Sequence, residues 1–219
     1  MFVDRRDAGR QLAGLLKKYQ GREGVLVLAL PRGGVVVGFE IAAQLKADLA
    51  VLIVRKIGFP RQPELAAGAV AETGTVVLNK EILSSSGGAT DAYVEQETAR
   101  QKEEIVRRVA LYRKGAAIKA LKDRTVILVD DGVATGATMK AAIEALKKEG
   151  LRKLVIAVPV APPVTAEELR GMADEFICIG TPPDFMSVGN HYLDFTQVTD
   201  EEVVQLLEKA GAVEGGKAA

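Results

Sequence analysis

VILVDDGVATGATM, residues 126–139, is the stretch of sequence that decides the fold. Its first four residues are apolar and β-prone, as expected of a strand buried on both faces of a parallel sheet. Residues 139–149 (MKAAIEALKKE) have helical spacing, so a helix is predicted after the loop. The acidic pair and the Gly/Thr loop therefore lie between a strand's carboxyl end and a helix's amino end, where α/β sheets bind ligands.

The loop after this strand offers the groups that bind a sugar phosphate. Backbone N–H groups at a helix start have no helical partner, and they donate to a phosphate in a favourable dipole field. The loop donors are those of Ala134, Thr135, Gly136, Ala137 and Thr138. Asp130 and Asp131 can each accept from a ribose hydroxyl.

The plain alternative is a strand-turn-helix whose aspartates cap the helix. Ala137 stands where a Walker loop has lysine, which excludes that loop. The aspartates could instead accept a phosphoryl group, but the T-G-A-T sequence that follows them would then have no role.

These residues closely resemble the 5-phosphoribosyl 1-pyrophosphate (PRPP) motif of type I phosphoribosyltransferases, a hydrophobic strand followed by two acidic residues and a T-G-x-T loop. The resemblance implies that Asp130 and Asp131 bind the ribose hydroxyls and that residues 134–138 bind the 5-phosphate. It also implies an α/β fold with a mainly parallel sheet flanked by helices, a small hood, and a hairpin and helical insertion.

A second segment matches the same family upstream. Residues 25–30 (VLVLAL) predict a strand, and residues 35–45 predict a helix. Between them lie Pro31, Arg32, Gly33 and Gly34. By resemblance this is the pyrophosphate loop, with Arg32 as its basic side chain and a cis non-proline peptide between Pro31 and Arg32. The alternative is a turn with a solvated arginine.

A third segment, residues 50–54 (AVLIV), predicts a strand that ends before Arg55 and Lys56. It resembles the R-K pair of adenine and orotate phosphoribosyltransferases. Lys56, and less strongly Arg55, would neutralise the charge that builds on the departing pyrophosphate. A solvated basic strand end is the alternative.

Length and composition indicate one α/β domain. The 219 residues are 48% hydrophobic, and 29 Lys and Arg balance 29 Asp and Glu, which gives no reason to expect nucleic-acid or membrane partners. We expect a domain over residues 1–211, an insertion at 58–121, a hood near 180–198 and a flexible tail at 212–219. The single cysteine, Cys178, lies in an apolar run and is expected to be structural. No segment reads as a signal or a membrane span, so a cytoplasmic protein is expected.

The middle of the chain predicts a hairpin of residues 65–71 and 75–78, followed by a polar loop and a charged helix at 92–113. The charged residues of this helix favour a solvated face, and its length suggests a packing arm or a homodimer contact. In the family a mobile loop from this region covers the reacting centre. Residues 58–64 are the preferred candidate and residues 79–91 the second; either could be an ordinary connection.

The acceptor is expected under the C-terminal hood. Phe185, Val188 and Asp194 loosely resemble the aromatic, Val-Gly and Asp elements of hypoxanthine-guanine enzymes, whose Asp helps to place a metal. Phe185 or Tyr192 could stack on a base, although such side chains often pack on the core. The lone histidine, His191, is more often a bystander than a base. Ala134 departs from the aspartate of the hypoxanthine-guanine enzymes and is nearer to the adenine and uracil enzymes.

The resemblance implies a Mg²⁺- and PRPP-dependent phosphoribosyltransferase of nucleotide metabolism. It would transfer the phosphoribosyl group to a nitrogenous acceptor, expected to be a nucleobase, and release pyrophosphate. Asp130, Asp131, Lys56 and Arg32 would carry the chemistry. Two alternatives stay open: a PRPP- or nucleotide-binding regulator of the same fold, and a nucleotide-binding interaction module without catalysis. The sequence has no added helix-turn-helix pattern, which disfavours the regulator.

Overall fold

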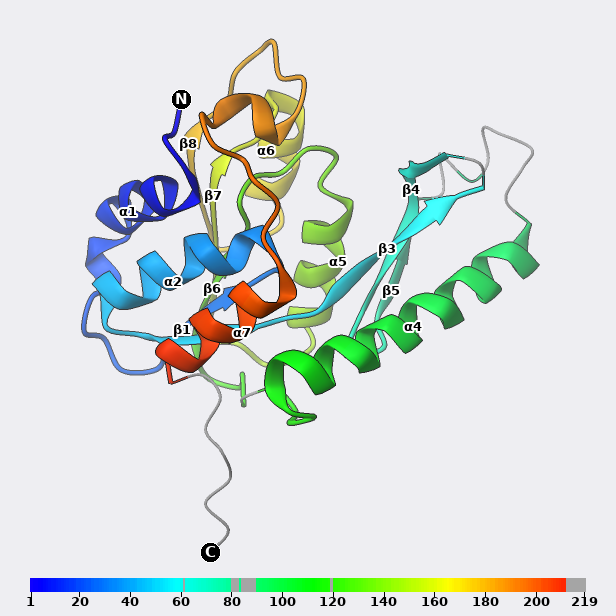
Figure 1. Cartoon of the computed structure of the whole chain (residues 1–219), viewed down its shortest axis with the longest axis horizontal. Coiled ribbons are helices and arrows are strands. Elements are labelled where there is room, and N and C mark those ends of the chain that lie inside the picture. Colours follow the sequence, from blue (N-terminus) through cyan, green and yellow to red (C-terminus); the bar gives the residue numbers. More distant parts are fainter. Residues whose placement is uncertain (61, 80–82, 84–89, 119, 212–219) are drawn as a thin grey trace, which may run out of the picture.

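The computed structural model describes residues 1–60, 62–79, 83, 90–118 and 120–211, with residues 62–65 described for the backbone alone. Its centre is a sheet of parallel strands in the order β2-β1-β6-β7-β8 (Figure 1). The strands are β1 (Val25–Ala29), β2 (Asp48–Val51), β6 (Thr125–Val129), β7 (Lys153–Val160) and β8 (Glu175–Gly180). The predicted parallel α/β core is confirmed.

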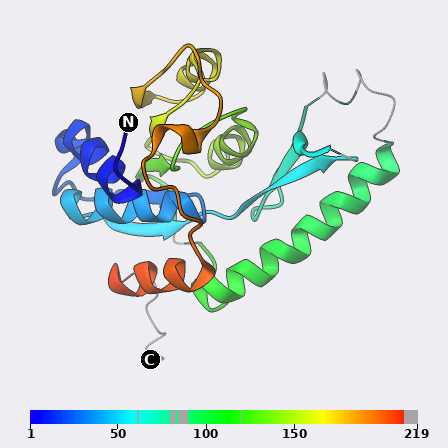
Figure 2. The same cartoon turned by 45° about the horizontal axis from the view of Figure 1, so that its top comes forward.

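Helices cover both faces of this sheet (Figures 1 and 2). One face carries α1 (Arg5–Leu15) and α2 (Gly33–Leu45), with α7 (Asp200–Lys209) packed against α2. The other face carries α5 (Ala137–Leu146) and α6 (Pro163–Arg170). Alternate strand residues point to opposite faces, so Val27 packs with the first group and Leu28 with the second. The buried strands are therefore apolar at every position.

A second, antiparallel sheet projects from this core (Figure 1). It contains β3 (Val54–Phe59), β4 (Gln62–Ala71) and β5 (Val76–Leu78). The helix α4 (Asp91–Arg113) packs along β3 and β4, as Figure 2 shows, while α5 contacts the same two strands. The predicted hairpin is confirmed as β4 and β5, and the predicted charged helix is confirmed as α4.

Two segments, residues 58–64 and 79–91, are the candidates for the mobile loop over the reacting centre. Phe59 pairs with Gln62 at the tip of the β3–β4 hairpin, so most of residues 58–64 belongs to paired strands. Of the second candidate, residues 80–82 and 84–89 lie outside the described residues, as does the tail at 212–219.

The strand predicted at residues 50–54 is wrong in its boundaries. β2 ends at Val51, and β3 begins at Val54 in the other sheet. Leu52 and Ile53, both almost fully buried, link the two strands, so the apolar run continues while the chain changes sheet. Arg55 and Lys56 consequently lie inside β3 and point to opposite faces of it.

Candidate functional site

The Gly/Thr loop after β6 ends at an uncapped helix start. Gly136 is the N-cap residue of α5, with φ 77°, and no side chain caps this helix. Glycine suits this left-handed conformation because it has no Cβ. The first helical hydrogen bond joins Lys140 N to Gly136 O at 2.8 Å. The N–H groups of the preceding helical residues have no helical acceptor, and they can donate to an anion in the positive end of the helix dipole.

A cavity of about 280 Å³ lies over this loop. Lys56, Asp130, Val188 and the loop residues 132–139 line it. The buried hydroxyl of Thr165, on α6, donates to Ala134 O at 2.9 Å and so fixes the loop's path. The cavity thus brings the Lys56 side chain, far away in the sequence, to the Asp130 carboxylate and to the backbone N–H groups of the Gly/Thr loop.

The Pro31-Arg32-Gly33-Gly34 loop adjoins the acidic pair. The peptide bond between Pro31 and Arg32 is cis, so that expectation is confirmed. A Cβ on Gly33 would overlap the Asp131 carboxylate, and a Cβ on Gly34 would lie 2.9 Å from Asp130 Cα. Only glycine permits this approach, which places the first turn of α2 against both aspartates.

Asp131 is held by residues of the N-terminal segment and the hood. Arg5 Nε donates to Asp131 Oδ2 at 2.6 Å, and only 10% of the Arg5 side chain is exposed. The Arg5 guanidinium also lies 3.8 Å from the centroid of the Phe195 ring. Tyr192 donates its hydroxyl to Asp131 O at 2.5 Å. The contact of Arg5 with Asp131 is not predicted from the sequence, because no local pattern links two residues that are 126 positions apart.

The two carboxyl groups are difficult to ionise together. Burial, together with the charge of Asp131, raises the pKa of Asp130 well above its usual value. Burial also raises the pKa of Asp131, while Arg5 opposes that change. Asp131 N donates to Asp130 Oδ1 at 2.8 Å, which partly stabilises the charged form. A ligand that brings hydroxyl donors or a cation would stabilise both carboxylates.

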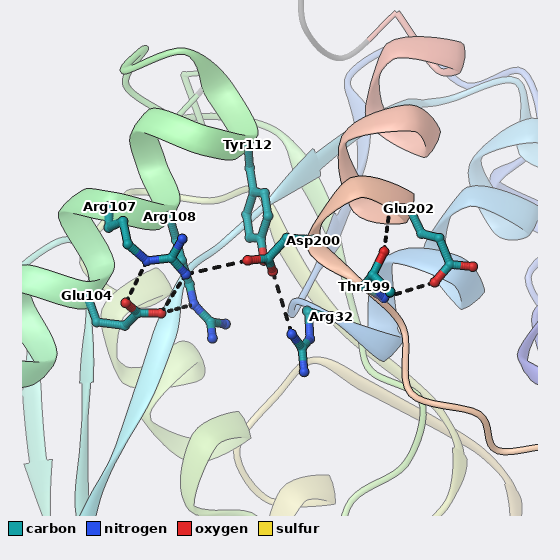
Figure 3. Close-up of polar contacts among 8 residues, drawn as sticks. All are labelled: Arg32, Glu104, Arg107, Arg108, Tyr112, Thr199, Asp200 and Glu202. Atoms are coloured by element: carbon teal, nitrogen blue, oxygen red, sulfur yellow. Dashed lines mark hydrogen bonds and ion pairs between the residues drawn. The ribbon is translucent and has the colours of Figure 1, made fainter.

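The basic residues take three different positions. Lys56 lines the cavity over the loop, whereas Arg55 points to the other face of β3 and donates from Nε to Gln101 Oε1 at 2.9 Å. Arg32 Nη1 lies 3.7 Å from Asp200 Oδ1 at the start of α7 (Figure 3). The structure therefore brings Lys56 to the Gly/Thr loop and pairs Arg32 with Asp200.

The hood residues divide between cavity and core. Val188 lines the cavity, and the Phe185 ring stacks on His191 with centroids 5.3 Å apart. Tyr192 is buried between Phe2 and Phe195, and this burial raises its pKa, so the hydroxyl stays a donor. Asp194 is exposed and accepts from Thr196 N at 2.9 Å.

The donor set suits a magnesium ion that arrives with its substrate. Within the described ranges, no group of three or more His, Cys, Asp or Glu residues could enclose a metal. Mg²⁺ commonly takes one or two carboxylates and completes its shell with substrate phosphates and water. Asp130 and Asp131, beside the Gly/Thr loop and the cis-peptide loop, fit that role, while Asp194 lies away from the cavity.

The Gly/Thr loop, the acidic pair and the cis-peptide loop thus lie at the carboxyl ends of the strands of a parallel α/β sheet, where proteins of this class bind ligands. The chain belongs to the phosphoribosyl transferase domain family, whose model matches residues 5–190. This membership agrees with the type I phosphoribosyltransferase-like fold and with a transferase class.

Relatives support the assignment over most of the chain. It is 46% identical over 213 residues to "Putative phosphoribosyl transferase Rv0571c" of Mycobacterium tuberculosis, and the match covers 96% of this chain and 47% of the relative. A counterpart from a second strain of that species matches equally. The chain thus spans about half the length of the curated relatives it matches. The crystal structure of TT1426 from Thermus thermophilus is 47% identical, with a TM-score of 0.78 over 95% of this chain and 98% of that one.

Across the described part of the chain, none of the helices is both long enough and apolar enough to cross a membrane. Cys178 is a free thiol whose Sγ lies 3.1 Å from Gly180 O, and burial raises its pKa. A protonated, half-buried thiol fits the structural role expected of it.

Proposed function

We propose that this protein transfers the 5-phosphoribosyl group from PRPP to a nitrogenous acceptor, a nucleobase, and releases pyrophosphate. The observation that carries the proposal is the cavity over residues 132–139, where Lys56 and Asp130 face an uncapped helix start. Phosphate, ribose hydroxyls and pyrophosphate would each find matching groups within one continuous site.

The binding steps follow from the positions of these residues. The loop N–H groups and the hydroxyls of Thr135 and Thr138 would hold the 5-phosphate. Asp130 and Asp131 would accept from the ribose hydroxyls, and Arg5 would keep Asp131 oriented for that contact. A bound Mg²⁺ would supply electrostatic stabilisation of the pyrophosphate and would be held by the aspartates and the substrate.

The chemical step is the exchange of one bond for another at C1 of the ribose. A ring nitrogen of the acceptor forms the new N–C1 bond as the C1–O bond to pyrophosphate breaks, and the bonding electrons leave with the pyrophosphate oxygen. Lys56 and Arg32 would stabilise the charge that builds on this leaving group. The carboxylates add negative potential beside the positive charge that develops on the sugar ring.

The hood would close the acceptor side of the site. Val188 already faces the cavity, and Phe185 offers an aromatic ring for stacking on a base. Tyr192 is assigned a supporting role instead, because it is buried and bonded to the backbone of Asp131.

Another observation favours a second candidate, a regulator that binds PRPP without turning it over. Two groups assigned to the chemistry already have partners of opposite charge: Asp131 pairs with Arg5, and Arg32 pairs with Asp200. Partners of this kind would weaken the stabilisation that these two charges give to the transition state. Phosphate binding by the Gly/Thr loop would not be affected.

Pyrophosphate release from Mg²⁺-PRPP, with purine and pyrimidine bases supplied separately, distinguishes the two candidates. We expect release with at least one base, reduced about a hundredfold or more in Asp131→Asn. Glu144→Gln, which alters an exposed carboxylate near the far end of α5, is the matched control and should keep full activity. PRPP binding without release for any base would support the regulator. Unchanged turnover in Asp131→Asn would contradict the assigned site.

A further inference from the structure

A second cleft lies on the opposite face of β3 from Lys56. It has a volume of about 390 Å³ and is formed by Arg55 of β3 and by residues of α4. The α4 residues that line it are Arg100, Gln101, Glu103, Glu104 and Arg107. Because neighbouring residues of a strand point to opposite faces, this cleft is separate from the cavity over the Gly/Thr loop.

Arg55 is the innermost cation of the cleft, and its contact there is with a neutral group. Gln101, only 5% exposed, donates from Nε2 to Glu97 Oε1 at 2.7 Å and presents Oε1 to Arg55. Among the described residues, no carboxylate lies within ion-pair distance of Arg55. Burial, with the nearby charge of Arg108, lowers the pKa of Arg55. The positive charge of Arg55 is therefore incompletely compensated.

Two carboxylates beside the cleft, Glu97 and Glu104, are already engaged by other arginines, while a third, Glu103, lines the cleft from an exposed position. Glu104 accepts from Arg107 Nε and from Arg108 Nε, each at 2.8 Å (Figure 3). These contacts, with that from Arg107 the stronger, hold the pKa of Glu104 at about 2. Glu97 likewise accepts two hydrogen bonds from Arg100. Glu97 and Glu104 thus fix these arginine side chains in place, and Arg55 has no ion-pair partner among the described carboxylates.

We propose that this cleft binds a phosphate group, supplied by inorganic phosphate or by a nucleotide, at a site distinct from the proposed PRPP cavity. Arg55 lies at its base, and Arg100 and Arg107 lie at its rim. Guanidinium groups bind phosphate through paired N–H donors, and ordered arginines lose less entropy when they do so. A phosphate would also supply the negative charge that Arg55 lacks.

The adjacent residues Arg55 and Lys56 provide a matched pair of variants. Arginine Nε–Hε resonances of Arg100 and Arg107, and backbone amides of residues 134–138, can be followed separately by NMR while inorganic phosphate is added. In Arg55→Gln we expect the Kd measured at Arg100 and Arg107 to rise about tenfold, because a charge-assisted hydrogen bond is lost. In Lys56→Gln those two resonances should titrate as in the wild type, while the loop amides respond more weakly.

Two further arms complete the test. Arg55→Lys keeps the charge without the planar fork, and its Kd should lie between those of the wild type and Arg55→Gln. Titration with ADP identifies the source: equal Kd values indicate recognition of phosphate alone, and tighter ADP binding indicates a nucleotide phosphate. Resonances of Arg100 and Arg107 that stay fixed in the wild type, or that shift alike in Arg55→Gln, would overturn the proposal. The loop amides report on the proposed transferase site, so the two failures are distinguishable.

Discussion

Arg5 gives Asp131 a fixed orientation before any ligand binds. Its guanidinium donates to the carboxylate from Nε and to Thr196 O from Nη1 at 2.8 Å, and it covers the Phe195 ring. The N-terminal segment and the hood therefore meet at the side chain assigned to the ribose. Because both partners are largely buried, removing one of them should cost more stability than breaking a surface ion pair does.

Replacement of Arg5 tests this directly. Arg5→Gln leaves the Asp131 carboxyl buried without its cation, and we expect the free energy of unfolding to fall by about 2–3 kcal/mol. The matched control is Arg6→Gln, because Arg6 pairs with Glu40 at 3.0 Å but is 47% exposed. That change should cost less than about 1 kcal/mol. Urea denaturation of the two variants gives the comparison, and equal losses would show that burial does not strengthen the Arg5 pair.

Asp130 should make stability depend on pH. Its pKa is raised in the folded protein, so between the unfolded value of about 3.9 and the folded value the native state binds more protons than the unfolded state. The free energy of unfolding therefore falls as pH rises through that window. Asp130→Asn removes the ionisation and can keep the oxygen that accepts from Asp131 N.

We expect Asp130→Asn to be more stable than the wild type at pH 7 by roughly 1–2 kcal/mol, and the difference to vanish near pH 4. Urea midpoints at the two pH values measure it. PRPP affinity at pH 7 should fall in the same variant, because a hydroxyl acceptor has lost its charge. A variant that is less stable than the wild type at pH 7 would show that the Asp130 carboxylate is satisfied in the free protein.

At the scale of elements, the start of α7 links the cis-peptide loop of residues 31–34 to α4 (Figure 3). Thr199 and Glu202 form a capping box that fixes the helix start. Asp200, which follows Thr199, accepts a hydrogen bond from the fully buried Tyr112. Its carboxylate also pairs with Arg107 at 3.4 Å and with Arg32 at 3.7 Å. Although burial opposes ionisation, the hydrogen bonds from Tyr112 and Arg107 keep the pKa of Asp200 below its usual value. A charged Asp200 would compete with pyrophosphate for Arg32.

Asp200→Asn should accordingly tighten pyrophosphate binding by severalfold, since it removes a carboxylate from beside the anion site. Affinity for ribose 5-phosphate should not change, because the proposed site for that phosphate is the Gly/Thr loop, away from Asp200. Thr199→Ala is the control: it removes the cap of the same helix and should cost about 1 kcal/mol of stability without changing pyrophosphate affinity. Calorimetric titration measures both ligands. Weaker pyrophosphate binding in Asp200→Asn would show that Asp200 instead positions Arg32 for the ligand.

The elements that sequence predicted well are those whose signal is local. A continuous apolar run and a Gly-rich loop predicted β6 and the start of α5, and the resemblance placed the cis peptide before Gly33. The change of sheet at Leu52 and Ile53 left no such signal, because buried linkers and buried strands are equally apolar. The partners Arg5 and Asp200 were missed for a related reason: tertiary packing, not spacing, brings them to Asp131 and Arg32.

At the scale of the whole molecule, a buried ion pair fastens the projecting sheet and α4 to the core. Glu72, just after β4, accepts from Ile53 N at 2.9 Å through Oε1 and from Arg113 through Oε2. Arg113, the last residue of α4, also donates to Val51 O at 3.4 Å. Both side chains are less than 10% exposed, at 9% for Arg113 and 8% for Glu72. The pair therefore joins β4, α4 and the link between the two sheets.

Glu72→Gln should loosen this arm without unfolding the central sheet. The amide keeps an oxygen for Ile53 N but leaves the Arg113 charge buried and unpaired, which costs about 3 kcal/mol. If the arm opens as a unit, amide hydrogen exchange in α4 and β4 should accelerate about a hundredfold, with β1 and β6 unaffected. Glu167→Gln, in an exposed pair with Arg170, is the control and should change neither region. Equal acceleration in β1 and α4 would mean that arm and core open together, so that the ion pair stabilises the whole protein.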